Sequence, residues 1–249
     1  MDFKEALSIK GKIAYAEGQL FGRVAARACR LLSFWASGGD DKRITEEVRD
    51  SLSSVMGALR GAGPRVISFS GEEKPIVVFI DGACEEDCTS IGGILFEHGK
   101  RPQAFGAVMA KWVVREWATK EDQSQVICQA EIFPTLVARH TWKERLRGKR
   151  VLYFIDNDSA RLALIKSYSP VLSSLRIIEQ CAVWDCKENC TSWFARVPTG
   201  ANCADGPSRM LTDVVDDYGA EIIQPLLPDS RVWTTDVLGF GHARIHDSD

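Results

Sequence analysis

The segment VVFIDGAC, residues 77–84, contains an apolar run that ends at an acid, Asp81, and is followed by a Gly-Ala turn. Burying a carboxylate at the end of an apolar strand costs free energy unless the carboxylate has a partner. Three later acids occupy comparable places in the sequence: Glu131 in QAEIFPTLVA, Asp156 after the apolar run VLYFI, and Asp205 in NCADGPSR. Four acids at or near the ends of elements predict a shared cation.

The composition is that of a globular protein in which basic and acidic residues are almost equal in number. The chain has 249 residues, of which 45% are hydrophobic and 26% are charged, which suits one medium domain with accessory elements or two small domains. With 31 basic and 34 acidic residues the net charge is -3, so nucleic acid would have to be bound through a local cluster. The densest basic run, WKERLRGKR at residues 142–150, is of a kind that more often forms a solvated helix end.

Targeting and cysteine signals indicate an intracellular protein. The first residues, MDFKEALSIKGK, lack the apolar core of a signal peptide, and no apolar run reaches the ~18 residues of a membrane span. Eight cysteines in such a chain are expected to be free thiols in a reducing compartment. The spacing of Cys181, Cys186 and Cys190 matches no standard zinc pattern. We therefore expect a protein of the nucleus or cytoplasm that is neither secreted nor inserted in a membrane.

The chain is predicted to have three parts. Residues 1–70 form a small helical segment with a linker, because apolar side chains recur at helical spacing before and after the predicted cap Thr45, and GAGPR then ends the pattern. Residues 71–218 have strand and helix patterns in turn. Residues 219–249 form a C-terminal tail with few structural signals.

The middle part is predicted to be a mixed sheet. Three short apolar runs, PIVVFIDGA, SIGGILFEHG and RPQAFGAVM, predict an antiparallel meander. A helix over about residues 124–144 follows, although Pro134 argues against a regular interior. Then come strand VLYFID, two helices, strand TSWFARVP and a helix that begins near Asp205. This order predicts an α/β fold with a mixed five-stranded sheet flanked by helices. Three aromatic residues of this part are expected in the core: Trp184, Trp193 and Phe194.

The predicted order of elements brings the four acids together. Asp81 and Asp156 end two strands that should be neighbours at the centre of the sheet, while Glu131 lies in the first turns of one helix and Asp205 begins the last. Such a cluster repels itself at neutral pH without a cation. Oxygen ligands favour Mg²⁺ or Mn²⁺, and two such ions ~3.5–4 Å apart can support phosphodiester hydrolysis. We therefore expect metal-assisted hydrolysis with two bound ions.

These motifs carry a family resemblance. From about residue 75 to residue 215 the chain resembles the ribonuclease H domains attached to reverse transcriptases of retroelements. FIDGA resembles the first-strand motif, QAE the first-helix motif, YFIDND the fourth-strand motif, and WFARVPTGANCADGPSR the terminal strand, loop and helix. The last motif resembles the ending found in DIRS-like and related retroelements. Residues 1–70, with GKIAYAEGQLFGR, are similar to the helical connection between polymerase and ribonuclease H in such proteins.

The resemblance implies an activity, a set of site residues and partners. The activity is endonucleolytic hydrolysis of the RNA strand of RNA·DNA hybrids, by a part or remnant of a retroelement reverse transcriptase. Possible partners are the hybrid and a reverse transcriptase polymerase domain. The metal ligands implied by the motifs are the four acids Asp81, Glu131, Asp156 and Asp205, with Asp158 as a second-ranked alternative. Residues expected near the substrate are Gly82 and Ala83, through exposed backbone amides, and Asn157, Asn202 and Arg209.

Two departures from the family pattern leave other functions open. The loop PTGAN before Asp205 has no histidine, which in many family members assists product release, so turnover is expected to be slow. No basic protrusion that would grip a hybrid is evident. The alternatives are a DNA nuclease of the same fold, of the exonuclease or resolvase kind, and a non-catalytic module that binds nucleic acid or protein.

Overall fold

The computed structural model describes residues 2–20, 23–37, 44–61, 74–85, 88–119 and 126–228. Three helices come first: α1 (Phe3–Leu20), α2 (Ala26–Ser37) and α3 (Glu46–Gly61). The strands are β1 (Ile76–Glu85), β2 (Cys88–Phe96), β3 (Gln103–Val108), β4 (Arg150–Ile155), β5 (Thr191–Arg196) and β6 (Glu221–Ile222). The remaining helices are α4 (Lys111–Thr119), α5 (Ile127–Thr141), α6 (Lys143–Leu146), α7 (Asp158–Lys166), α8 (Leu172–Lys187), the 3-10 turn η1 (Thr199–Ala201), α9 (Asp205–Ser208) and α10 (Asp213–Asp217).

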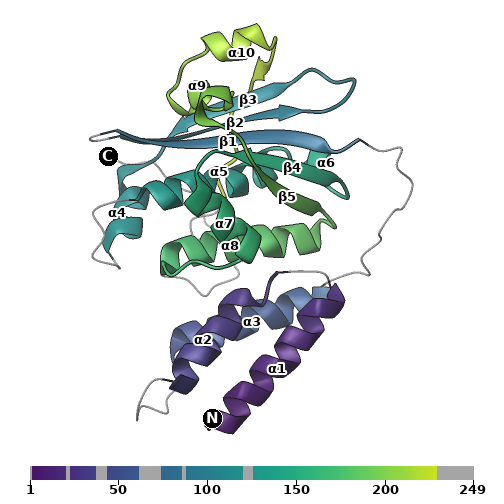
Figure 1. Cartoon of the computed structure of the whole chain (residues 1–249), viewed down its shortest axis with the longest axis vertical. Helices are drawn as coiled ribbons and strands as arrows, with labels where there is room; N and C mark the ends of the chain where they lie inside the picture. Colours follow the sequence, from purple (N-terminus) through teal and green to yellow (C-terminus); the bar gives the residue numbers. More distant parts are fainter. Residues whose placement is uncertain are drawn as a thin grey trace.

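The strands form one mixed sheet in the order β5-β4-β1-β2-β3-β6. The first three strands are an antiparallel meander, and β4 and β5 run parallel to β1. Helices α5, α7 and α8 lie on one side of this sheet, and α9 and α10 lie on the other (Figure 1). The predicted mixed sheet flanked by helices is therefore confirmed, in the predicted order of elements.

The number of strands was predicted wrongly, because the described sheet has six strands and not five. The sixth strand, β6, is only Glu221–Ile222 and pairs in parallel with β3. These residues belong to the segment that we assigned to the C-terminal tail. Two residues are too few to show the alternating pattern by which a strand is recognised in a sequence, and β6 is therefore defined only by its hydrogen bonds to β3.

Helix α5 occupies the centre of the main core. It packs against β1, β2 and α8, and all of its side chains from residue 129 to residue 139 are buried. Pro134 lies inside the helix, although we expected it to interrupt a regular interior. Burial of the helix between a sheet and a second helix stabilises it enough to accept the lost hydrogen bond.

One arginine joins α5 to three other elements. The guanidinium group of Arg139 has no exposed surface and donates hydrogen bonds to both carboxylate oxygens of Asp185 on α8, at 2.8 and 3.0 Å. It also donates to the carbonyl oxygen of Thr135 and to Oγ of Ser192 on β5, each at 2.9 Å. The same group lies 4.6 Å from the ring centroid of Tyr153 on β4. These contacts fix α5 and α8 relative to the sheet.

The edge of the sheet at β5 is only partly covered. Phe194 and Trp184 are buried, as we predicted, but Trp193 is 69% exposed. Trp193 and Phe194 are successive residues of a strand, so their side chains point to opposite faces. Phe194 faces the main core. The prediction that Trp193 belongs to the core was wrong because the strand pattern does not show which face is covered.

The basic run at residues 142–150 is largely paired within the protein. Lys143 and Arg147 each form a salt bridge with Glu188, at 3.0 and 2.7 Å. Arg145 forms one with Glu97 at 2.7 Å. These cations therefore tie the α5–β4 connection to neighbouring elements. None of the described helices has both the length and the apolar character needed to cross a membrane.

The N-terminal helices pack against α8 through a buried ion pair. The guanidinium group of Arg27 on α2 contacts the carboxylate of Glu179 on α8 at 2.7 Å, and the two side chains are 8% and 2% exposed. A small apolar cluster of Val24, Ala58 and Val183 lies at the same junction. Figure 1 shows these three helices beyond α8, on the side away from the sheet. The pair therefore anchors the N-terminal helices to the domain that contains the sheet.

Removing one member of this pair should destabilise the protein. Glu179→Leu leaves Arg27 buried and unpaired, so the free energy of unfolding in urea should fall by about 3–5 kcal/mol. The double variant Arg27→Met, Glu179→Leu removes both charges and should recover most of that loss. As a control, Lys100→Ala breaks a surface pair with Glu97 whose lysine is 59% exposed and should cost less than about 1 kcal/mol. A Glu179→Leu protein as stable as the wild type would contradict the anchoring role.

Candidate metal site

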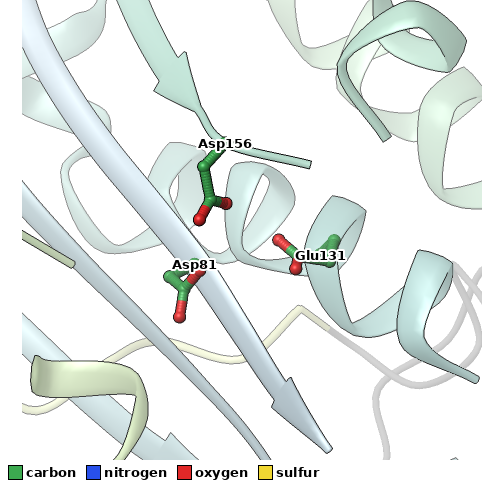
Figure 2. Close-up of side chains that lie close together, drawn as sticks. All are labelled: Asp81, Glu131 and Asp156. Atoms are coloured by element: carbon green, nitrogen blue, oxygen red, sulfur yellow. The ribbon is translucent and has the colours of Figure 1, made fainter. Parts of the chain in front are cut away.

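Three of the four predicted acids meet at one place. Asp81 comes from β1, Glu131 from α5, and Asp156 directly follows β4. One carboxylate oxygen from each of them lies within 4.8 Å of the others, and Figure 2 shows the three side chains gathered in this space. Asp81 is 4% exposed and Glu131 is 7% exposed. The structure thus forms a largely buried group of three carboxylates from three different elements.

The register of the sheet explains why the two aspartates meet. β1 and β4 are parallel neighbours, and Phe79 is opposite Phe154. Asp81 and Asp156 each come two residues later, so their side chains lie at the same level and on the same face of the sheet. The rings of Phe79 and Phe154 stack below them with centroids 4.8 Å apart. The predicted arrangement of these strands at the centre of the sheet is confirmed.

A glycine brings Glu131 to the aspartates. A Cβ atom on Gly82 would lie 2.3 Å from the carbonyl oxygen of Ala130 and 2.7 Å from the backbone nitrogen of Glu131. Any side chain at this position would therefore push α5 away from β1. Pro134 has no N–H group to donate to the carbonyl of Ala130, four residues earlier, and the oxygen of this carbonyl is the atom nearest to the Gly82 position. Backbone contact between β1 and α5 sets the position of Glu131.

Burial and mutual repulsion raise the pKa values of two of the acids. The pKa of Glu131 rises from 4.5 to about 8, mainly through burial and then through the charges of Asp81 and Asp156. The pKa of Asp81 rises from 3.8 to about 6, again mainly through burial, with further contributions from the charges of Asp156 and Asp205, while a hydrogen bond from Ser208 opposes the rise. Negative charge is therefore disfavoured here unless a cation compensates it.

The oxygen atoms of the site fit a divalent cation. Glu131 Oε2 and Asp156 Oδ1 are buried and have no hydrogen-bond partner among the described residues. Unsatisfied buried carboxylate oxygens are costly, and a hard cation such as Mg²⁺ or Mn²⁺ is bound by such oxygens. Asp81, Glu131 and Asp156 would hold this cation.

The structure places the fourth acid, Asp205, beside this group and not within it. Its side chain is 40% exposed and forms an ion pair with Arg209 at 3.0 Å, one turn later along the chain. Arg209 also contacts Glu85 at 2.6 Å. Asp205 is close enough for its charge to raise the pKa of Asp81, but its carboxylate is paired with the arginine. The predicted cluster of four acids is thus a cluster of three, with the fourth at its exposed side.

Predicted substrate contacts at the first strand have a different environment from the one we expected. Gly82 and Ala83 are buried, and the backbone N–H of Gly82 donates a hydrogen bond to the carboxylate of Glu131. A contact of the Gly82 and Ala83 amides with RNA stays a prediction. Glycine is required at this position because the backbone of α5 occupies the space that a side chain would take.

The two predicted asparagines also contact the protein itself. Asn157 caps α7, since its side-chain oxygen accepts a hydrogen bond from the N–H of Ala160 at 3.0 Å, and its side chain also bonds to Glu131. Asn202 is 5% exposed and donates to the carbonyl oxygen of Ile80 at 3.1 Å. Both asparagines therefore hold the acidic group in place. Asp158, the alternative ligand, is 53% exposed and contacts Arg161 at 2.9 Å.

One residue that contacts the acidic group was not among the predicted site residues. Ser208 is fully buried and donates a hydrogen bond from its hydroxyl group to Oδ2 of Asp81 at 2.5 Å. It lies three residues after Asp205 in the terminal motif, from which we selected only Asn202, Asp205 and Arg209. A serine in a short polar motif resembles an ordinary turn residue, so the sequence contains little that distinguishes it.

No family model and no curated protein matches the chain. Among solved structures, the chain is similar to ribonuclease H1 from Halobacterium salinarum, with 15% identity and a TM-score of 0.42 over 58% of this chain and 99% of that one. It is also similar to the N-terminal RNase H domain of a Mycobacterium tuberculosis protein, with 13% identity and a TM-score of 0.38 over 59% of this chain and 99% of that one. A third is LC11-RNase H1 in complex with an RNA/DNA hybrid, with 14% identity and a TM-score of 0.38 over 56% and 98%.

Adding a methyl group at Gly82 should disturb the site and the fold together. Because the new Cβ would overlap the backbone of α5, we expect Gly82→Ala to lower the free energy of unfolding by about 1–3 kcal/mol or more. Gly57→Ala is the matched control, because Gly57 lies inside α3 with no atom within 4 Å of the added Cβ. This control should stabilise the protein by about 0.5–1 kcal/mol. Equal effects of the two substitutions in urea denaturation would contradict the packing argument.

The raised pKa values predict how the stability of the metal-free protein depends on pH. In the folded state Asp81 and Glu131 keep their protons up to pH values near their pKa values of about 6 and about 8. The same carboxyl groups in the unfolded chain have ordinary pKa values and have already lost these protons. The free energy of unfolding should therefore fall as pH rises from about 5 to about 8. Glu131→Gln removes the larger contribution and should reduce this fall by on the order of 2 kcal/mol.

Urea denaturation in chelator at several pH values measures this effect. Glu144→Gln provides the control, because its side chain is 77% exposed and the variant should follow the wild type. If wild type and Glu131→Gln lose stability in parallel between these pH values, Glu131 does not hold the proton that we assign to it.

Proposed function

We propose that this chain is a metal-dependent nuclease of the ribonuclease H type that hydrolyses the RNA strand of RNA·DNA hybrids. The observation that carries the proposal is the buried group of Asp81, Glu131 and Asp156, in which two carboxylate oxygens have no partner among the described residues. The order of the motifs along the chain, and the elements on which they lie, support it. Divalent cations held there would activate water and stabilise the charge that develops on a phosphodiester.

The residues of the site would have separate roles in metal binding and in positioning. Asp81, Glu131 and Asp156 hold the metal, and Gly82, Asn157 and Asn202 keep these side chains and their backbone in place. Asp205 lies at the exposed side of the group, where a substrate phosphate would approach. We propose that Asp205 becomes a further ligand when Arg209, its present partner, turns to the negatively charged nucleic acid. Asp81 and Asp205 would then hold a second cation.

The wider context is also a proposal. The resemblance of the terminal motif to DIRS-like retroelements, together with the helices α1, α2 and α3 ahead of the sheet, supports an origin as part or remnant of a reverse transcriptase. In that setting the N-terminal helices would connect the nuclease to a polymerase domain. Hybrid would be recognised through phosphates and 2′-hydroxyl groups, with little dependence on base sequence.

Cleavage of labelled duplexes tests the activity. The wild type should cut the RNA strand of an RNA·DNA hybrid in Mg²⁺ or Mn²⁺, but not in chelator, and should leave matched RNA·RNA and DNA·DNA duplexes intact. Asp156→Asn should lower the rate more than about 100-fold. Asp158→Asn is the matched control, because this neighbouring acid is exposed and paired with Arg161 and Arg196; its rate should stay close to that of the wild type.

The outcomes separate the proposed function from its alternatives. Metal-dependent cutting of DNA would identify a DNA nuclease of the same fold. A folded protein that cuts no duplex with either metal would favour a non-catalytic module that binds nucleic acid or protein. Full activity in Asp156→Asn would show that the chemistry takes place elsewhere in the molecule.

A further inference from the structure

The short helix α9 lies directly on the sheet because two glycines make room for it. Asp81, Gly92 and Gly106 are paired in one row across β1, β2 and β3. A Cβ atom on Gly92 would lie 2.3 Å from the backbone nitrogen of Ser208, and one on Gly106 would lie 2.4 Å from the carbonyl oxygen of Pro207. The backbone of the terminal motif thus rests on the two glycines next to Asp81.

This close packing brings a hydroxyl group to the acidic group. Ser208 is fully buried, and its Oγ lies 2.5 Å from Oδ2 of Asp81. The carbonyl oxygen of Asp205, at 2.8 Å from the same Oγ, competes for the single hydroxyl proton, but a bond to a carboxylate is shorter and stronger than one to a neutral carbonyl. The hydroxyl group therefore donates to Asp81.

The other carboxylate oxygen of Asp81 also faces a donor. The side-chain nitrogen of Asn202 lies 3.4 Å from Oδ1 of Asp81 and 3.1 Å from the carbonyl oxygen of Ile80. Each carboxylate oxygen can accept two bonds, so both oxygens keep a lone pair for a cation. Contacts from the terminal motif thus restrict the rotation of the Asp81 side chain without using up its ligand atoms.

We propose that Ser208 is a positioning residue, which holds the Asp81 carboxylate in the orientation that binds the metal. The close packing of α9 on Gly92 and Gly106 places Ser208 against the sheet. The inference rests on the proposed function, because it takes Asp81 to be a metal ligand. Groups that bond to a ligand fix its geometry and commonly change metal affinity or activity by about 10–100-fold when they are removed. The terminal motif thus serves the site through Ser208 as well as through Asp205.

Binding of Mn²⁺, measured by isothermal titration calorimetry on the full chain, tests the role of Ser208 without requiring activity. Ser208→Ala should weaken Mn²⁺ binding by about 10–100-fold, while Ser208→Thr keeps the hydroxyl group and should recover most of the affinity. Ser51→Ala is the matched control, since Ser51 is also a fully buried serine but belongs to α3. Its affinity should stay within about twofold of the wild type.

A second variant tests the close packing of the Ser208 backbone on the sheet without removing the hydroxyl group. Gly92→Ala displaces the backbone at Ser208 and should weaken Mn²⁺ binding in the same direction as Ser208→Ala. Circular dichroism and thermal unfolding in chelator establish whether each variant is folded. If Gly92→Ala does not fold, the comparison between Ser208→Ala and Ser208→Thr still decides the question.

The results separate a failure of this inference from a failure of the proposed function. A folded Ser208→Ala protein that binds Mn²⁺ as tightly as the wild type overturns the positioning role and leaves the metal site intact. Equal weakening in Ser208→Thr and Ser208→Ala also overturns it, because the hydroxyl group would then have no effect. A wild-type protein that binds no Mn²⁺ overturns the metal site itself and the inference with it.

Discussion

Repulsion among three carboxylates, two buried and one half-buried, is the constraint on which the rest of this structure depends. Asp81, Glu131 and Asp156 would separate if β1, β4 and α5 were free to move, because burial strengthens the repulsion between like charges. The elements are held by contacts elsewhere: β1 and β4 by their parallel pairing, and α5 by the buried guanidinium of Arg139, which binds Asp185 on α8 and Ser192 on β5. A rigid surrounding thus keeps the acids close enough to share a cation.

Glycine places backbone against backbone on both faces of the sheet beside Asp81. On one face, Gly82 lets α5 approach β1 and so brings Glu131 into the group. On the other face, Gly92 and Gly106 let α9 rest on β2 and β3, which brings Ser208 to Asp81. A Cβ at any of the three positions would separate an acid from its neighbours. The geometry of the site therefore depends on residues that have no side chain.

Arginines pair with many of the exposed and buried acids, and this pairing explains several differences between expectation and structure. Asp205 was predicted to be a fourth ligand but is paired with Arg209. Basic residues 143–147 were the best candidates for a nucleic-acid surface but are paired with Glu188 and Glu97. Arg27, in a helical segment with no predicted contact, forms a buried pair with Glu179. Which acid an arginine meets depends on distant parts of the chain, and local sequence patterns do not show it.

The sequence by itself determined the order of the elements, the mixed sheet and three acids that meet, because strand and helix periodicity, and an acid at the end of an apolar run, are local patterns. It also pointed to Asn157 and Asn202, although not to their contacts with Glu131 and Ile80. Only the tertiary structure decided that Asp205 lies outside the group, that Trp193 is exposed, that β6 completes the sheet and that Ser208 bonds to Asp81. Each of these depends on segments far apart in the chain, and their packing is a property of the whole fold.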